Sequence, residues 1–191
     1  MKDLFFVAAQ VEEYLRSKNW QFCFIGGIAL QRWGEPRLTI DIDLTLLTGL
    51  GNEEPFIQDL LKQYAGRRPD AADFALRYRV VLLQSDAVGI DVALGALPFE
   101  ENSIRRASSF AFLPGVELRT CSAEDLVVMK AFADRGRDWE DVRGILIRQG
   151  AKLNWVQIRD ELSPLCELKE APHILPRLDV LRREVGGAGA R

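Results

Sequence analysis

A short apolar run in which two aspartates alternate with aliphatic residues limits the possible folds of this chain more than any other feature. The run is Thr39-Ile40-Asp41-Ile42-Asp43-Leu44-Thr45-Leu46. Because side chains alternate along a strand, a strand over residues 38–47 places its aliphatic residues on one face and Asp41, Asp43 and Thr45 on the other. The two carboxylates then lie roughly 7 Å apart at their backbones and repel each other. Such a pair is tolerated in open water or beside a cation that both can bind, and oxygen ligands suit Mg²⁺.

A glycine pair, Gly26-Gly27, precedes this strand and follows the apolar run Phe22–Ile25. A strand that turns through glycines into a helix exposes backbone N–H groups at the helix N-terminus, where phosphate binds well. Glycine also allows a ligand to approach the backbone closely. Taken alone, the pair is explained more simply as a strand-to-helix turn, but the aspartate strand that follows favours a phosphate-binding role. The sequence matches neither a Walker loop nor a dinucleotide fingerprint.

A third aspartate lies in another apolar run, Gly89-Ile90-Asp91-Val92. An unpaired charge within such a run is costly, so Asp91 requires a partner. If the strand expected over residues 88–94 lies beside the first, Asp91 completes a cluster of three carboxylates, which is the minimum for two-metal phosphoryl chemistry. The alternative is that Asp41 and Asp43 form a solvated edge face, paired with an arginine such as Arg32, Arg37 or Arg77.

Composition excludes several other kinds of site. The chain has 191 residues, a net charge of -3, three widely spaced cysteines and one histidine, His173. The spacing of the cysteines and the single histidine disfavour a zinc site, and the single histidine argues against Ser-His-Asp and Cys-His catalysis. No apolar stretch approaches the roughly 20 residues that span a bilayer, and no signal peptide is evident, so we expect a cytoplasmic protein with no membrane contact.

The remaining pattern predicts a strand-rich front followed by helices. Helices are expected over residues 3–17, 28–33, 55–64, 122–136, 138–150, 154–163 and 176–185, and strands over 22–25, 38–47, 78–83, 88–94, 110–113 and 116–120. Residues 66–70 read as a loop. Ser122 and Asp125 form a capping box, and Gly136 is expected to end that helix. The chain then divides into a core over residues 1–120, a helical region over 121–185 that caps the cleft, and a disordered tail over 186–191.

These motifs carry a family resemblance. Gly26-Gly27, then Arg37-x-Thr39-x-Asp41-Ile42-Asp43-Leu44, then Asp91 resemble the nucleotidyltransferase superfamily of the DNA polymerase β type. The later run from Glu124 to Val142 is similar to the AbiEii/AbiGii toxin branch, and the resemblance covers roughly residues 20–150. Many members of the superfamily have Gly-Ser where this chain has Gly-Gly, so Gly27 leaves backbone N–H groups to contact the phosphates. Gly-Gly is usual in the toxin-like branch.

The resemblance implies an α/β (α+β) fold with a short mixed sheet flanked by helices and a helical C-terminal half. It also implies roles for the acidic residues and the glycines. Asp41 and Asp43 would hold Mg²⁺ (or Mn²⁺) against the triphosphate of an NTP, and Asp91 would complete the second metal position and orient or deprotonate the acceptor hydroxyl. Gly26 and Gly27 would contact the phosphates.

Three further residues are candidates for nucleotide binding. The family pattern places Lys130 near the triphosphate, whereas its simplest local explanation is an i,i+4 pair with Asp134. Asp138 is kept as a candidate by the resemblance alone, because it also fits a helix N-cap. Arg37 could contact phosphate or pair with Asp41 or Asp43.

The implied activity is Mg²⁺-dependent transfer of an NMP from an NTP to tRNA or protein, by a toxin of a toxin–antitoxin system with a cognate antitoxin as partner. Two alternatives stay open at this point. One is a small-molecule nucleotidyltransferase of the aminoglycoside-modifying type, and the other is a non-catalytic nucleotide-binding module.

Overall fold

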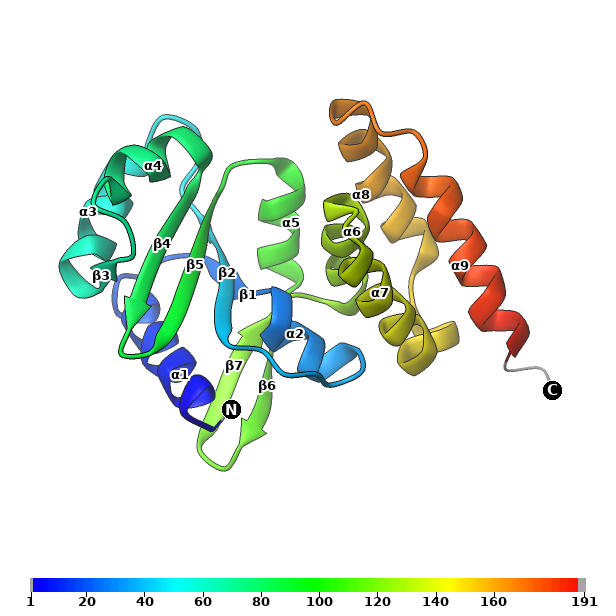
Figure 1. Ribbon diagram of the computed structural model, residues 1–191, viewed down its shortest axis with the longest axis horizontal. Coiled ribbons are helices and arrows are strands. Elements are labelled where there is room, and N and C mark those ends of the chain that lie inside the picture. Colours follow the sequence, from blue (N-terminus) through cyan, green and yellow to red (C-terminus); the bar gives the residue numbers. More distant parts are fainter. Residues whose placement is uncertain (1, 189–191) are drawn as a thin grey trace. The chain divides into compact units, whose positions relative to one another are not determined.

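The computed structural model describes residues 2–188, which form two compact units (Figure 1). The sheet unit comprises residues up to Ile28 together with Arg37–Cys121, and the helical unit comprises Ala29–Pro36 together with residues from Ser122 on. Helix α2 (Gly26–Trp33) begins in the sheet unit and ends in the helical unit. All strands of the described chain belong to the sheet unit.

The strands form one mixed sheet in the order β3-β4-β5-β2-β1-β7-β6. Their bounds are β1 (Phe22–Phe24), β2 (Asp41–Leu47), β3 (Ala65–Gly66), β4 (Val80–Ser85), β5 (Val88–Gly95), β6 (Ser108–Leu113) and β7 (Val116–Thr120). The central strand β2 pairs with β1 in antiparallel and with β5 in parallel orientation. The short mixed sheet flanked by helices that we expected is therefore confirmed.

Alternation along β2 and β5 gives the sheet one apolar face. Ile42, Leu44, Leu46 and Ile90 are fully buried on it, and Val92 is nearly so. Helices α1 (Lys2–Ser17), α3 (Glu53–Gln63) and α4 (Ala71–Tyr78) contribute to the same apolar core. In Figure 1 these helices lie on one side of the sheet. The strands are therefore held by burial on one face, which leaves the other face for polar side chains.

Helix α5 (Pro98–Arg106) lies on that opposite face, where it contacts β2 and β1. A Cβ atom on Gly95 would meet both Thr45 Cγ2, at 2.9 Å, and Glu100 Cβ, at 3.3 Å. The end of β2 that carries Thr45 is thus covered by α5, and Thr45 is buried. The other end, with Asp41 and Asp43, is only half-buried.

The helical unit consists of α6 (Ala123–Ala133), α7 (Gly136–Gln149), the short 3-10 helix η1 (Gly150–Lys152), α8 (Trp155–Leu168), α9 (Ile174–Ala188) and the end of α2. The Ser122 side chain accepts a hydrogen bond from the backbone N–H of Asp125, which confirms the predicted cap of α6. None of the helices in residues 2–188 is both long and apolar enough to cross a membrane.

The aspartate strand is shorter than expected. Strand β2 begins at Asp41, because its ladder with β5 starts where Gly89 lies opposite Asp41. Ile40, which we placed on the buried face, is 68% exposed. Because Ile40 is apolar, the alternating pattern of the sequence begins before the hydrogen-bonded ladder between β2 and β5.

Two helices were missed by the sequence analysis. Helix α4 follows the stretch 66–70, which we expected to be a loop. The first residue of the stretch, Gly66, is the end of β3 and pairs with β4, so this stretch is not simply a loop. Helix α4 has eight residues, of which only the alanines Ala71 and Ala75 are buried, so no large side chain marks its buried face. Helix α5 is polar, but its start carried a usable signal. Pro98 is its first residue, and the Glu100 carboxylate accepts from the N–H groups of Ala96 and Leu97.

Two helix ends also differ from expectation. Helix α6 ends at Ala133 because Asp134 adopts a left-handed conformation (φ 59°), and Gly136 begins α7 instead of ending α6. Aspartate tolerates this conformation better than most residues. Helix α9 continues through Ala188, so residues 186–188 of the expected disordered tail are helical, while residues 189–191 lie outside the described chain.

Two separate substitutions, Ile40→Ala and Ile42→Ala, test where β2 begins. Ile42→Ala should lower the free energy of unfolding by about 2–5 kcal/mol, because Ile42 is fully buried. Ile40→Ala should change it by no more than about 0.5 kcal/mol, because Ile40 lies at the surface. Urea denaturation measures both values. Similar losses in the two variants would contradict the observed start of the strand.

Candidate active site

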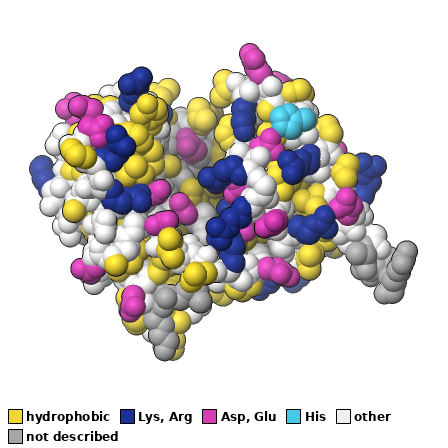
Figure 2. All heavy atoms as spheres, in the orientation of Figure 1, with side chains coloured by type: hydrophobic (Ala, Val, Ile, Leu, Met, Phe, Trp, Pro, Cys, Tyr) yellow, Lys and Arg dark blue, Asp and Glu magenta, His cyan; other side chains and the backbone are white. Residues whose placement is uncertain are grey.

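The three candidate metal-binding aspartates lie on two neighbouring strands of the sheet unit. In the parallel pairing of β2 with β5, Asp43 lies opposite Asp91 and Asp41 lies opposite Gly89. Residues that face each other across such a ladder project to the same side of the sheet. Asp91 therefore shares the polar face with Asp41 and Asp43, away from the buried Ile42 and Ile90. Figure 2 shows acidic side chains grouped on the visible surface of this unit, in the region of β2 and β5.

The glycine pair lies against this carboxylate face. A Cβ atom on Gly26 would fall 2.1 Å from Asp43 Oδ2, and the residue has a positive φ of 53°. The backbone N–H of Gly27 donates to the same oxygen at 3.4 Å. A Cβ atom on Gly27 would fall 2.2 Å from Thr39 Oγ1. The positive φ and the close approach of Asp43 require glycine at position 26, and Thr39 fills the space beside Gly27. Asp43 lies beside the N-terminus of α2, where a negative charge is stabilised.

The sequence analysis missed one residue of this face, Arg67. Its guanidinium donates from Nη2 to Asp91 Oδ1, and the side chains of Arg67 and Asp91 are 28% and 35% exposed. The one signal in the sequence that pointed to Arg67 was the need of Asp91 for a cationic partner. The sequence offers many arginines, and Arg67 lies in a stretch that reads as a loop.

Burial raises the pKa of Asp91 above its ordinary value. The positive charge of Arg67 lowers that pKa, and the negative charge of Asp41 raises it again. The influence of Asp41 on Asp91 indicates that their carboxylates are close enough to interact. A carboxylate with a raised pKa is a better proton acceptor than an ordinary aspartate.

The chemistry of the donors fits a hard divalent cation. Asp41, Asp43 and Asp91 offer carboxylate oxygens only, as Mg²⁺ prefers. Within residues 2–188, no three His, Cys, Asp or Glu side chains are arranged as a ready-made metal centre. One of the two carboxylate oxygens of Asp91, Oδ1, already accepts a hydrogen bond from Arg67.

Arg37 lies in the same unit, shortly before β2. Its Nη1 donates to the carbonyl oxygen of the neighbouring Leu38 at 3.3 Å. The guanidinium thus contacts the backbone just before β2.

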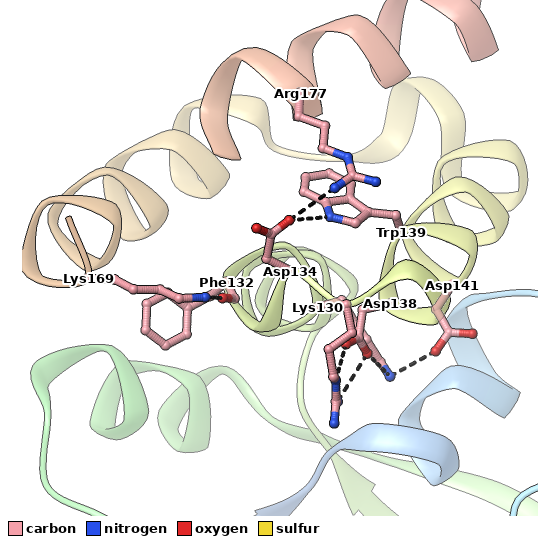
Figure 3. A network of polar contacts seen from close by, with 9 residues as sticks. Lys130, Phe132, Asp134, Asp138, Trp139, Asp141, Lys169 and Arg177 are labelled. Carbon is pink, nitrogen blue, oxygen red and sulfur yellow. Dashed lines mark hydrogen bonds and ion pairs between the residues drawn. The ribbon is translucent and has the colours of Figure 1, made fainter. Parts of the chain in front are cut away.

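Lys130 and Asp138 belong to the helical unit, where they form a buried ion cluster (Figure 3). Lys130 Nζ lies 3.0 Å from Asp138 Oδ1 and 2.8 Å from Asp141 Oδ2. Only 8% of Lys130, 2% of Asp138 and 6% of Asp141 is exposed. Lys130 therefore pairs across to α7, and the alternative local explanation, an i,i+4 pair with Asp134, is wrong.

The alternative role of Asp138 as an N-cap is also wrong. Helix α7 starts at Gly136 with Arg135 as its N-cap residue, so Asp138 lies inside the first turn. Burial would raise the pKa of Asp138, but hydrogen bonds from Arg135 and Lys130 outweigh burial and hold that pKa below its usual range. Arg135 Nε donates to Asp138 Oδ2 at 2.5 Å.

Asp134 has partners of its own at the end of α6. Its carboxylate accepts from Trp139 Nε1 at 2.7 Å and from Arg177 at 3.2 Å, as Figure 3 shows, and it lies 2.7 Å from His173 Nε2. The hydrogen bond with His173 is the main reason that the pKa of Asp134 is lowered, followed by that with Trp139. The cluster joins α6 to α7 and α9, which explains why Asp134 is held in a left-handed conformation.

Solved structures with a similar fold define the class of protein. An antigenic nucleotidyltransferase-like protein from Paracoccidioides brasiliensis matches with a TM-score of 0.56 and 16% identity, over 93% of each chain. The antibiotic-resistance factor ANT(2'')-Ia matches with a TM-score of 0.59 and 15% identity, over 89% of this chain and 95% of its own. At these identities the likeness concerns the fold, which is that of nucleotidyltransferases. None of the curated protein sequences matches the chain significantly.

The family is narrower than this fold class. Residues 15–183 match the family model described as nucleotidyl transferase AbiEii toxin, type IV toxin–antitoxin system. The chain therefore belongs to the AbiEii nucleotidyltransferase family and is a nucleotidyltransferase. The solved structures agree with this family in fold.

Removing the ammonium of Lys130 tests the buried ion cluster. Lys130→Met should lower the free energy of unfolding by about 3 kcal/mol, because Asp138 and Asp141 would keep buried negative charges without their lysine. The matched control is Lys152→Met, which removes an exposed lysine of the same unit and should cost no more than about 1 kcal/mol. Equal losses in urea denaturation would show that the cluster contributes no more than a surface lysine.

The lowered pKa of Asp138 predicts a dependence of stability on pH. Because the folded-state pKa is below the unfolded-state value of about 3.9, Asp138 stabilises the fold fully above that value and progressively less as the pH falls through its folded-state pKa. The difference in unfolding free energy between wild type and Asp138→Asn should therefore shrink below about pH 4. Urea denaturation between neutral pH and pH 3 measures it, with Asp160→Asn as an exposed control on α8. A difference that stays constant or grows in acid would contradict this assignment.

Proposed function

We propose that the protein transfers a nucleoside monophosphate from an NTP to a hydroxyl group of tRNA or protein, in a Mg²⁺-dependent reaction that releases pyrophosphate. The observation that supports it most is the register of β2 and β5, in which Asp43 faces Asp91 beside the Gly26-Gly27 turn. Carboxylates on the same face of adjacent strands, next to a helix N-terminus, suit a cation and a phosphate chain together.

The residues of the sheet unit would have separate roles in this reaction. Asp41, Asp43 and Asp91 would hold the divalent cation, which when bound neutralises phosphate charge and polarises the bond to the leaving pyrophosphate. The N–H groups of Gly26 and Gly27 would contact the phosphates. Asp91 would also orient the acceptor hydroxyl and accept its proton. Most of the rate enhancement would come from positioning and charge stabilisation.

Lys130, Asp138 and Arg37 are assigned to the nucleotide on the family pattern. Two of the three N–H groups of the Lys130 ammonium are directed to Asp138 and Asp141, which leaves one for a phosphate oxygen. In this proposal Asp138 and Asp141 together hold the Lys130 ammonium in place. Arg37 would contribute a guanidinium to the phosphates.

The family description suggests a toxin that acts with a cognate antitoxin, and such a pair would function in the cytoplasm. The acceptor could instead be a small molecule, as in aminoglycoside modification, but the likeness to ANT(2'')-Ia is one of fold. A non-catalytic nucleotide-binding module would have no need to keep Asp41, Asp43 and Asp91 together on one face.

Transfer of label from an NTP tests the proposed activity. The protein is incubated with each α-labelled NTP, Mg²⁺ and either total cellular RNA, cell lysate or an aminoglycoside, and labelled products are separated by size. We expect label on RNA or protein with wild type and a loss of about 10²–10³-fold in rate with Asp43→Asn. Chelation of Mg²⁺ should abolish the labelling.

The matched control is Asp73→Asn, the same change at an exposed aspartate of α4, which should keep full activity. Label on the aminoglycoside alone would replace the proposed acceptor by a small molecule. NTP binding in calorimetry without any labelled product would instead favour the non-catalytic module.

A further inference from the structure

The ion pair between Arg67 and Asp91 is built into the sheet, because the backbone fixes where Arg67 lies. Arg67 N–H donates to the carbonyl oxygen of Leu82 at 2.9 Å, and Leu82 lies directly opposite Asp91 in the pairing of β4 with β5. The preceding residue, Gly66, pairs with Leu83 at the end of β3. The guanidinium therefore reaches Asp91 across β4 from a fixed point of attachment.

The sheet also leaves space for this side chain. A Cβ atom on Gly89 would lie 2.5 Å from Asp41 Oδ1 and 3.0 Å from Arg67 Nη1. Any side chain at position 89 would thus displace Asp41, Arg67 or both. The absence of a side chain at Gly89 allows the guanidinium and the Asp41 carboxylate to approach the same point above β5.

The charge balance of this face explains what Arg67 contributes. Three carboxylates on two adjacent strands repel one another, and burial penalises the charge of Asp91 further. A guanidinium stays protonated at all ordinary pH values and forms strong hydrogen bonds with carboxylates. Arg67 therefore offsets part of a repulsion that would otherwise oppose the pairing of β2 with β5.

The same contact has a consequence for cation binding. The Arg67 hydrogen bond occupies Asp91 Oδ1, and a divalent cation held by Asp91 would use lone pairs of the same carboxylate. Two positive charges next to each other also repel. We propose that Arg67 is the internal counter-ion of Asp91 and competes with the divalent cation for it, so that Arg67 sets how much cation the site requires. This inference rests on the proposed role of Asp91 as a metal ligand.

Cation binding in the absence of nucleotide tests the competition. Mn²⁺ affinity is measured by calorimetry or by the EPR signal of free Mn²⁺ for wild type, Arg67→Gln and Arg67→Lys. Arg67→Gln should bind Mn²⁺ about tenfold more tightly, a factor equivalent to about 1.4 kcal/mol, which is slightly below the range for a hydrogen bond to a charged group. Arg67→Lys should lie between wild type and Arg67→Gln, because it keeps the charge but loses the planar fork.

The matched control is Arg68→Gln. Arg68 is the next residue along the chain, but it pairs with Asp70 and lies over the ring of Phe74. Its loss should leave Mn²⁺ affinity unchanged. Thermal unfolding with and without Mn²⁺ provides a second readout, in which the cation should raise the midpoint of Arg67→Gln more than that of wild type.

Equal or weaker Mn²⁺ binding by Arg67→Gln, or no measurable binding by either protein, would overturn the inference. So would an equal gain in Arg68→Gln. Asp91→Asn separates this failure from that of the proposed function. If Asp91→Asn weakens Mn²⁺ binding while Arg67→Gln does not tighten it, only the role of Arg67 is wrong. If Asp91→Asn binds Mn²⁺ like wild type, the carboxylate site itself is in doubt.

Discussion

The parallel pairing of β2 with β5 determines what the sheet unit can do. Its register places Asp43 opposite Asp91, while Ile42 and Ile90 face the apolar core. A shift by one residue would turn Asp91 into that core and bring an isoleucine to the polar face. The burial of the aliphatic residues therefore fixes the register, and the register in turn fixes where the acidic groups meet.

Buried or half-buried aspartates are balanced by basic side chains in both units. In the sheet unit Arg67 pairs with Asp91, and in the helical unit Lys130 lies between Asp138 and Asp141. The second cluster is the more deeply buried, so it contributes to the folding of α6 against α7. The first is more open to solvent. The same kind of contact thus serves stability in one unit and, in our proposal, the control of cation binding in the other.

The sequence was most informative where one face of an element is buried. The strands with Asp41, Asp43 and Asp91 were predicted from such patterns, and the glycine pair predicted the turn at Gly26-Gly27. The nucleotidyltransferase fold was implied by the family resemblance. Helix α4 was missed because it is short and buries only two alanines, and helix α5 was missed because it is polar. The partners of Lys130 and Asp91 were missed for another reason, since they depend on which segments meet in space. Local spacing pointed to Asp134 for Lys130, but Asp134 is bound by Trp139, His173 and Arg177.

The central claim is that Asp41, Asp43 and Asp91 bind a divalent cation on one face of the sheet. Anomalous diffraction from crystals grown with Mn²⁺ and a non-hydrolysable NTP would locate the cation directly. We predict a Mn²⁺ peak within coordination distance of Asp43 and Asp91, with the phosphates beside Gly26 and Gly27. A peak bound elsewhere, or an Asp91 side chain that remains bonded to Arg67 while the nucleotide is in place, would contradict the account.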